Sequence, residues 1–442
     1  FVDAVFRGEG EEHFPQWLSC WDNPTAWATI DGLCYLDENS VYHDNGKAKT
    51  SAFDCLVPPE ESHFFNWDKP FVQLETTRGC FNTCAFCVSG GEKPVRALSI
   101  DTIRQRLGTI HQHGIKNVRV LDRTFNANPR HAKELLNLFL EYHPHIRFHL
   151  EIHPALMNDA LKSELTRMPK GLLHLEAGIQ SLREPVLQQC RRMGKLAEAM
   201  EGLKFLCSQS NLDTHADLIA GLPLYRLEDI LEDIHTLASY CTGEIQLELL
   251  KLLPGTEMRM RAEELGIRYS PLPPYEVLQT NECTTAELQT ARQLSRLLDA
   301  FYNTPAWQEL TRTLILNEEG FLLQFLDYLN KRNLTDQPMS LEKRGLVLYE
   351  YCQKHYPQYQ IQASIAWIEA GMSLKKKPAE RAKTKHQTPP DAWEILEGTY
   401  KEELRLCFLP IDAEGTYGYW FGFEAESQRT TPVFKAKTSP NH

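Results

Sequence analysis

The sequence predicts an α/β protein whose central part is a partial (β/α)6 barrel of the TIM-like type. Strand and helix patterns alternate six times between residues 71 and 252. The strand patterns are stopped by turn formers such as Pro154, Gly221 and Pro254. Polar residues also recur at every second position in several strands, so one face of the sheet is expected to be polar.

Residues 1–68 are predicted to be the end of an N-terminal α/β domain followed by a linker. The segment 1–18 reads as a strand end, a turn at Gly8-Glu9-Gly10 and an amphipathic helix. Residues 20–68 alternate short extended pieces with Gly, Asn, Asp and Pro, which predicts a linker with a small hairpin. The chain starts with Phe1 in the middle of a pattern, so we expect it to be a fragment or a processed form.

Residues 69–270 form the predicted barrel domain. The expected strands are 71–77, 117–122, 146–152, 172–179, 213–219 and 244–252. The expected helices are 100–113, 131–142, 158–168, 184–208 and 227–240, with Ser99 as the N-cap of the first. The polar positions of the strands are Asp122, His149, Glu151, His153, His174, Glu176, Gln180, His215, Asp217, Gln246 and Glu248. Because parallel strands are usually apolar on both faces, this set favours a polar barrel interior that holds a ligand.

The chain is expected to become mainly helical after the barrel and to end in a small β region. Apolar residues recur at helical spacing within 284–303, 305–331, 340–354 and 360–371, so residues 271–374 are predicted to be a helical domain. Residues 375–392 are basic, contain Pro and have few apolar side chains, which indicates an exposed linker. Residues 393–442 contain short strand patterns and the aromatic run 417–423.

Composition excludes several classes of protein. The 442 residues are 42% hydrophobic and 24% charged, and their net charge is −12, so no overall positive field favours nucleic acid as a partner. No apolar run is long enough to span a membrane and no signal peptide is recognisable, so a cytoplasmic protein without a membrane partner is expected. Nine of the twelve cysteines stand singly, which is typical of buried thiols in a reducing compartment.

The other three cysteines are the strongest signal in the chain. Cys80, Cys84 and Cys87 have the spacing C-x3-C-x2-C directly after the first barrel strand. Soft thiolates at this spacing favour zinc or an iron–sulfur cluster. A structural zinc site needs a fourth Cys or His nearby, yet the next cysteine is Cys190 and no His follows Cys87 within twenty residues. The spacing therefore predicts a cluster with three protein ligands and one open iron.

A cysteine loop of this kind on a six-unit βα barrel resembles the radical S-adenosylmethionine (radical SAM) superfamily. The resemblance implies a 4Fe-4S cluster on Cys80, Cys84 and Cys87, whose fourth iron binds S-adenosyl-L-methionine (SAM). It also implies reductive cleavage of SAM, and an electron donor such as flavodoxin or ferredoxin.

Further motifs resemble the branch that contains the oxygen-independent coproporphyrinogen dehydrogenases. Phe86 stands where that branch has an aromatic residue near the SAM adenine. Glu151, in E-x-x-P, and Gln180, in G-I-Q-S, stand at positions that contact SAM in the branch. Arg192 follows that Gln by twelve residues, as an Arg paired with the SAM carboxylate does. Asp217 opens D-L-I-A-G-L-P and is expected near the ribose or adenine.

One position departs from that branch and resembles another subgroup. The branch has a Gly-Gly pair at the end of its second strand, whereas this chain has Leu121-Asp122-Arg123-Thr124-Phe125. The pattern that begins at Asp122 resembles the corresponding segment of radical SAM proteins that carry an N-terminal cobalamin-binding domain. Residues 1–18 resemble the end of that domain. The resemblance implies cobalamin as a further cofactor, with its binding domain largely upstream, and methyl transfer as the reaction.

Three readings follow from these residues. The first is a cobalamin-associated radical SAM enzyme, a methyltransferase acting on an unidentified small molecule or peptide. The second keeps radical chemistry without cobalamin, as in a dehydrogenase or a tRNA-modifying enzyme; acidic composition and the absence of a second cysteine group disfavour the tRNA-modifying case. The third is a non-catalytic cluster-binding or haem-binding chaperone. The sequence identifies no catalytic residue and no substrate.

Overall fold

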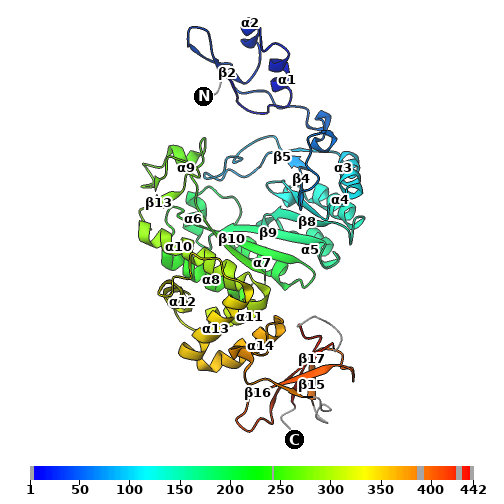
Figure 1. Cartoon of the computed structure of the whole chain (residues 1–442). Coiled ribbons are helices and arrows are strands. Elements are labelled where there is room, and N and C mark those ends of the chain that lie inside the picture. The colour runs from blue at the N-terminus through cyan, green and yellow to red at the C-terminus, as the bar shows by residue number, and fades with distance from the viewer. Residues whose placement is uncertain (1–3, 241–242, 386–392, 425–430, 439–442) are drawn as a thin grey trace. The chain divides into compact units, whose positions relative to one another are not determined.

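The computed structural model of the chain describes residues 4–240, 243–385, 393–424 and 431–438 (Figure 1). The chain divides into two compact units. The first unit comprises Phe1–Asn82, Gly91–Ile152 and Asn158–Leu175. The second comprises Thr83–Gly90, His153–Met157 and Glu176–His442. The boundary passes through the cysteine loop, so Cys80 belongs to the first unit and Cys84 and Cys87 belong to the second.

The predicted α/β class is confirmed by a sheet of six strands in the order β11-β10-β9-β8-β7-β4. The pairs β4–β7, β7–β8 and β10–β11 are all parallel. The strands are β4 (Val72–Leu74), β7 (Asn117–Val120), β8 (Arg147–Ile152), β9 (Leu173–Gln180), β10 (Asp213–Ala220) and β11 (Glu244–Leu249). Strand order therefore follows chain order, as expected for successive right-handed βα units. The first three residues of β9 belong to the first unit and the rest to the second.

The first unit opens with a small antiparallel sheet. Its strands are β1 (Ala4–Phe6), β2 (Leu33–Leu36) and β3 (Tyr42–Asp44), and the short helices α1 (His13–Leu18) and α2 (Pro24–Trp27) accompany them. Ile30, Leu33 and Tyr35 form its core, with Trp17 and Trp27 packed against them. The strand predicted within residues 1–18 therefore pairs with the predicted hairpin.

Three helices of the first unit follow its barrel strands. They are α3 (Ile100–Gln112), α4 (Pro129–Leu140) and α5 (Asp159–Thr166), close to their predicted ranges. Ser99 caps α3 as expected, because its hydroxyl oxygen accepts the Thr102 N–H at 3.1 Å. The cysteine loop connects two short strands, β5 (Thr77–Arg78) and β6 (Arg96–Ala97), which pair as an antiparallel hairpin.

The second unit contains α6 (Glu184–Gln189), α7 (Leu196–Ser208), α8 (Leu227–Tyr240) and α9 (Glu257–Met260). The prediction of one continuous helix over residues 184–208 was wrong. The chain leaves the helical conformation between α6 and α7, where Arg191 and Gly194 have φ values of 55° and 97°. A left-handed residue cannot continue a right-handed helix, so the apolar periodicity on both sides belongs to two helices.

The region after the barrel is mainly helical, as predicted. Its helices are α10 (Thr285–Leu297), α11 (Pro305–Asn317), α12 (Phe321–Asn330), α13 (Leu341–His355) and α14 (Gln360–Glu369), and α10 continues into a π-helical turn, Leu298–Tyr302. The predicted helix 305–331 is two helices, because Gly320 takes φ +71° between them. Before α10 lies a two-stranded sheet of β12 (Arg268–Tyr269) and β13 (Val277–Gln279).

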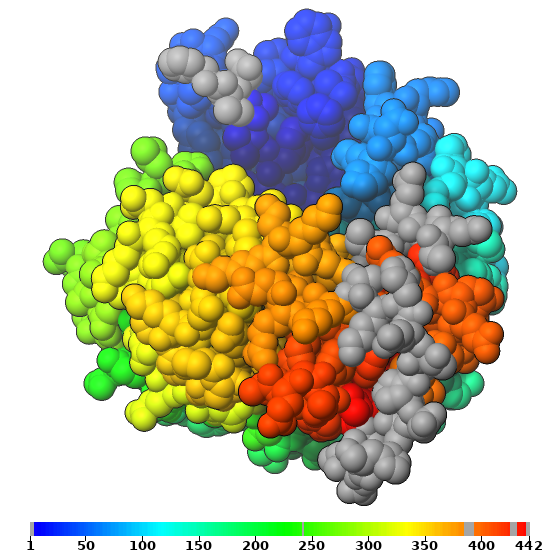
Figure 2. Space-filling model, turned by 60° about the horizontal axis from the view of Figure 1, so that its bottom comes forward, coloured from blue at the N-terminus to red at the C-terminus, as the bar shows by residue number. Residues whose placement is uncertain are grey.

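The chain ends in a five-stranded sheet in the order β14-β16-β17-β18-β15. The strands are β14 (Lys383–Lys385), β15 (Trp393–Gly398), β16 (Arg405–Pro410), β17 (Gly418–Phe423) and β18 (Phe434–Thr438). Phe408, Trp420 and Phe434 belong to its core, so aromatic side chains of this region pack the sheet. The surface of the last helices, orange in Figure 2, adjoins the red surface of this sheet, and Lys435 forms an ion pair with Glu369 of α14.

The predicted linker 375–392 is structured in the part that the structure describes. Residues Lys377–Ala379 form a 3-10 helix in which Ala379 is fully buried, and β14 follows. The expectation of exposure is therefore wrong at Ala379, because this short helix packs against α14. Residues 386–392 lie outside the described residues.

Among the described residues, the single cysteines other than Cys207 are thiols. Cys34, Cys190, Cys283, Cys352 and Cys407 are buried, as expected, whereas Cys20 is partly exposed and Cys55 is exposed, so the expectation of burial is wrong at these two. Cys207, however, is disulfide-bonded, so the expectation of a thiol is wrong there. Folding brings cysteines together that are distant in sequence, and single spacing does not reveal this. Among the described residues, none of the helices has the length and apolar character needed to cross a membrane.

Candidate active site

The first part of the cysteine loop, in the first unit, is held by backbone contacts around Gly79 and Cys80. The Cys80 N–H donates to the Glu92 carbonyl oxygen at 2.9 Å, and the Cys80 side chain is buried. Gly79 has φ +98°, and a Cβ there would lie 2.7 Å from the same carbonyl oxygen. Only glycine can adopt this φ value and avoid a clash with this oxygen, so Gly79 sets the backbone path at the start of the loop.

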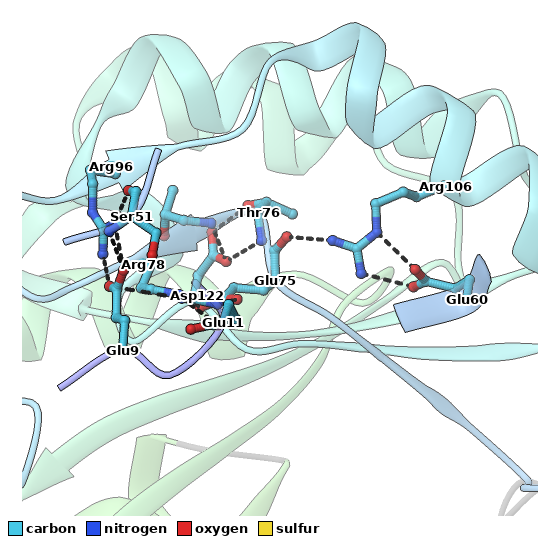
Figure 3. Close-up of polar contacts among 11 residues, drawn as sticks. Glu9, Glu11, Ser51, Glu60, Glu75, Thr76, Arg78, Arg96, Arg106 and Asp122 are labelled. Atoms are coloured by element: carbon cyan, nitrogen blue, oxygen red, sulfur yellow. Dashed lines mark hydrogen bonds and ion pairs between the residues drawn. The ribbon is translucent and has the colours of Figure 1, made fainter. Parts of the chain in front are cut away.

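Asp122, predicted as a cofactor contact, is engaged by the strand that leads into this loop (Figure 3). Its carboxylate is fully buried and accepts the N–H groups of Thr76 and Thr77, each at 2.8 Å, and the Thr76 hydroxyl. Burial raises the pKa of Asp122, while the hydrogen bonds from Thr76 and Thr77 act in the opposite direction. The residue thus ties the end of β7 to the chain after β4.

Charged residues surround the β5–β6 hairpin in the same unit (Figure 3). Arg78 donates to Glu75 at 2.8 Å and to Glu11 at 2.7 Å. Arg96 pairs with Glu9 and donates to the Ser51 carbonyl oxygen at 2.7 Å. Residues near the start of the chain therefore hold both strands at the base of the cysteine loop.

The second part of the loop, in the second unit, is a tight turn around Cys84 and Cys87. The Cys87 N–H donates to the Cys84 carbonyl oxygen and the Gly90 N–H to the Cys87 carbonyl oxygen, both at 3.1 Å. Cys84 is buried, whereas Cys87 and Phe86 are partly exposed. Ala85, between them, donates to the Cys190 carbonyl oxygen at 2.9 Å and accepts the Met258 N–H at 2.8 Å. The turn is therefore fixed to the end of α6 and the start of α9.

Arg192 connects this turn to strand β9. One guanidinium nitrogen lies 3.8 Å from the Cys84 sulfur, and another donates to the Gly178 carbonyl oxygen. A guanidinium beside a cysteine stabilises its thiolate form, which is the form that binds metals. Cys190 differs, because burial, reinforced by nearby Cys84, raises the pKa of its thiol to about 12. Cys190 is therefore a protonated thiol at neutral pH.

Gln180 ends β9 in an unusual backbone conformation, with φ +73°. A Cβ on Gly178 would lie 2.6 Å from the Gln180 side-chain nitrogen, so glycine makes room for this side chain. The turn that follows is held by Asp233 of α8. Its carboxylate, almost completely buried, accepts the Leu182 N–H at 2.8 Å, the Tyr225 hydroxyl at 2.6 Å and the Arg183 Nε–H at 3.1 Å.

Asp233 thereby joins the turn after β9 to Tyr225, which follows the Gly221-Leu222-Pro223 turn after β10. No sequence motif pointed to this residue, since it looks like one of several acidic residues in α8. Burial raises the pKa of Asp233, and burial together with the neighbouring Asp233 raises that of Tyr225. The two predicted ligand-contacting strand ends are thus positioned by one buried carboxylate.

The remaining predicted residues lie on the partly exposed faces of their strands. Glu151 and His149 are on this face of β8 in the first unit, where His149 packs edge-on against His174 with ring centroids 4.8 Å apart. In the second unit Asp217 is on β10, 3.5 Å from the ring of His215. His153 lies beyond the end of β8 and is buried. Its Nε2–H donates to the Met193 carbonyl oxygen at 3.0 Å, because a carbonyl oxygen can only accept.

Two parts of the chain match known families. Residues 74–237 match the radical SAM superfamily, and residues 263–394 match a protein family of unknown function, DUF4080. The second match covers most of the helical region and the start of the C-terminal sheet.

Curated relatives include two methyltransferases and a tRNA-modifying enzyme. An uncharacterized methyltransferase, PH0819, of Pyrococcus horikoshii is 29% identical over 143 residues, 30% of this chain and 31% of the relative. A tRNA-2-methylthio-N(6)-dimethylallyladenosine synthase of Dichelobacter nodosus is 27% identical over 189 residues, 40% of each chain. A cytidylyl-2-hydroxyethylphosphonate methyltransferase of Streptomyces wedmorensis is 24% identical over 178 residues, 32% of this chain and 33% of the relative. The chain thus spans well under half the length of these relatives.

Solved structures with a similar fold include two described as radical SAM enzymes. The methyltransferase TsrM from Kitasatospora setae, with cobalamin and a [4Fe-4S] cluster bound, is 17% identical with a TM-score of 0.51, over 65% of this chain and 60% of TsrM. The cobalamin-dependent enzyme OxsB, with aqua-cobalamin and S-adenosylmethionine bound, is 12% identical with a TM-score of 0.54, over 85% of this chain and 66% of OxsB. At these identities the likeness shows the fold. The six-stranded parallel sheet, the cysteine loop and the match over residues 74–237 show that this part of the chain is a radical SAM domain.

Proposed function

We propose that the protein uses a 4Fe-4S cluster held by Cys80, Cys84 and Cys87 to cleave SAM reductively, and that it transfers a methyl group to its substrate. The observation that carries the proposal is the C-x3-C-x2-C loop that follows the first strand of the parallel sheet. All three cysteines are present as thiols. Three soft donors in eight residues fit an iron–sulfur cluster that keeps one iron open.

The cofactors supply the difficult chemistry: when bound, the cluster and SAM together provide a radical that abstracts hydrogen from a substrate. The residues of the chain bind and orient. We assign to Arg192 two tasks, support of the Cys84 thiolate and a charge for the SAM carboxylate, because its guanidinium already lies beside that sulfur. Phe86 offers a partly exposed ring beside the third cysteine, suited to stacking on an adenine.

Glu151, Gln180 and Asp217 are assigned to further contacts with SAM. Each sits on the partly exposed face of its strand, and Gln180 is held at a strand end by the Asp233 contacts of the following turn. We assign Asp122 an indirect role, because its carboxylate accepts hydrogen bonds from Thr76 and Thr77 and so sets the course of the chain into the cysteine loop.

Cobalamin is proposed as the methyl carrier. A second SAM would supply the methyl group and leave as S-adenosylhomocysteine, because the SAM that is cleaved reductively keeps its methyl group on the released methionine. Support comes from Asp122 in place of the glycine pair, from the short β1–α1 segment at the start of the chain and from the cobalamin-containing proteins with the same fold. We propose that residues 1–68 adjoin a cobalamin-binding domain encoded upstream. A low-potential flavodoxin or ferredoxin is the proposed electron donor, and the cytoplasm, a reducing compartment, is the proposed location.

A SAM-cleavage assay tests the proposal. The reconstituted protein with dithionite and SAM should release 5′-deoxyadenosine and methionine, and Cys84→Ala should release neither. Arg192→Lys should retain the cluster but bind SAM more weakly, because Lys lacks the planar pair of donors. Absence of SAM cleavage by protein that carries an intact cluster would contradict the enzymatic reading and favour a cluster-binding chaperone.

A radical SAM enzyme without cobalamin, such as a dehydrogenase or a tRNA-modifying enzyme, is the second candidate. The match to a tRNA-modifying synthase over 189 residues favours it. Purification of the protein extended upstream separates the candidates, because the first requires retained cobalamin with its characteristic visible absorption. An extended protein that folds, binds SAM and retains no cobalamin would favour the second candidate.

A further inference from the structure

A cluster of acidic residues surrounds one buried histidine on the sheet of the second unit. His215 lies on β10 with its side chain 2% exposed, and Asp217 follows two residues later on the same face, 13% exposed. Glu176 stands on the neighbouring strand β9 and is 32% exposed. His215 is thus buried, Asp217 is partly buried, and Glu176 is the most exposed of the three side chains.

The distances within the cluster are those of metal ligands. The His215 Nε2 atom lies 3.4 Å from a Glu176 carboxylate oxygen and 3.5 Å from an Asp217 carboxylate oxygen. Hydrogen bonds from nitrogen to oxygen are usually about 2.7–3.2 Å long, so both distances are long for direct bonds. Around a tetrahedral ion with bonds of about 2.1 Å, neighbouring donor atoms lie roughly 3.4 Å apart. All three donor atoms are within 4.8 Å of one another.

Charge in the cluster favours a cation. Glu244 of β11 is paired in register with His215, and one of its carboxylate oxygens lies within 4.8 Å of a His215 ring nitrogen. Three carboxylates therefore stand near the His215 imidazole, and their combined negative charge favours a cation. Carboxylates at this separation in a partly buried place repel one another, and a bound cation would offset the repulsion.

We propose that Glu176, His215 and Asp217 bind a divalent metal ion of the zinc class. One imidazole and two carboxylates are donors that zinc accepts at tetrahedral spacing, and they differ in kind from the thiols of the cysteine loop. With three protein ligands the ion keeps an open position, reached past Glu176, for water or an oxygen donor of a substrate. The site goes beyond the proposed function.

Zinc binding to the cluster-loaded protein tests the site, because the cluster occupies the thiols that would otherwise take zinc. Equilibrium dialysis against Zn²⁺ should give one tightly bound zinc per chain in addition to the iron. Glu176→Gln, His215→Gln and Asp217→Asn should each weaken this binding about 100-fold or more. Glu248→Gln on the adjacent strand β11 and His235→Gln on α8 are matched controls that should bind zinc like the parent protein.

Two further measurements keep the proposal open to refutation. Zinc should raise the unfolding temperature of the parent protein and not that of folded Asp217→Asn or Glu176→Gln, because only a specific site links binding to stability. In Cys84→Ala, where Cys80 and Cys87 can themselves take zinc, adding His215→Gln should still lower the zinc content by one ion per chain. A parent protein that binds no zinc, or stoichiometric binding retained in all three variants, would overturn the site and leave the cluster proposal untouched.

Discussion

Asp233 shows how a single buried carboxylate organises residues that the sequence motifs single out separately. It accepts hydrogen bonds from Leu182, Tyr225 and Arg183, which lie beyond the ends of β9 and β10. The motif residue Gln180 immediately precedes this turn with φ +73°, a conformation that needs support from its surroundings. Asp233 is therefore a positioning residue for Gln180.

Asp233→Asn should lower the free energy of unfolding by about 2–4 kcal/mol. One carboxylate oxygen is replaced by an NH2 group, which cannot accept the hydrogen bond that the oxygen accepted. SAM binding by the folded variant should also weaken, with the cluster still present. Urea unfolding and SAM titration measure the two effects. Glu232→Gln is the matched control, since Glu232 pairs with the same Arg183 at 2.7 Å but is 70% exposed. Equal effects of both substitutions would contradict a positioning role.

His153 provides a pH prediction. Burial, helped by the nearby Arg192 charge, lowers the pKa of His153 from 6.5 to about 4. The unfolded chain takes up a proton at this residue below about pH 6.5, whereas the folded protein does so only near pH 4. His153 therefore contributes stability above pH 6.5, and this contribution is lost as the pH falls towards 4.

The free energy of unfolding should fall by about 3 kcal/mol between pH 7 and pH 4, because the pKa of His153 differs between the unfolded and the folded chain. His153→Gln keeps a donor for the Met193 carbonyl but does not titrate, so its unfolding free energy should fall less steeply over this range. The difference between the two pH profiles, measured by urea unfolding of cluster-free protein, isolates His153 from the other titrating groups. Parallel profiles would contradict the assignment.

At the level of elements, the β5–β6 hairpin controls how the cysteine loop begins. Gly79→Ala should destabilise this hairpin and reduce cluster retention, because Gly79 has φ +98° and no space for a Cβ. Gly108→Ala, in the middle of α3, meets no atom within 4 Å and should stabilise the protein by about 0.5–1 kcal/mol. The unfolding temperatures of the two variants should change in opposite directions, and only Gly79→Ala should lose iron. Full iron retention in Gly79→Ala would show that the loop tolerates another backbone path.

Element types and order were predictable from the sequence, because apolar periodicity and turn formers report them directly. The six strands and their order were found in this way. The breaks at Arg191–Gly194 and Gly320 were missed, since residues on both sides of each break keep helical periodicity. The motif residues of the candidate site were found through local patterns. The contacts of Asp233, and those among Glu176, His215 and Asp217, join separate strands and helices, and no local pattern encodes such contacts.

At the level of the whole molecule, charge separates the two leading candidate functions. The net charge of −12 opposes binding to a polyanion, and the basic segment at 375–377 is the strongest local exception. The protein should therefore show no measurable binding to tRNA at physiological salt in a filter-binding assay. Tight, salt-dependent binding that is lost when Lys375, Lys376 and Lys377 are replaced by Gln would instead favour a tRNA-modifying enzyme.

The central claim is that the cysteine loop holds a 4Fe-4S cluster, and metal content after anaerobic reconstitution tests it most directly. The account predicts about four iron and four sulfide ions per chain and a reducible cluster detected by electron paramagnetic resonance. Cys80→Ala, Cys84→Ala and Cys87→Ala should each lose the cluster, whereas Cys190→Ala should keep it. Stoichiometric zinc bound through these cysteines, or iron retained without them, would contradict the account.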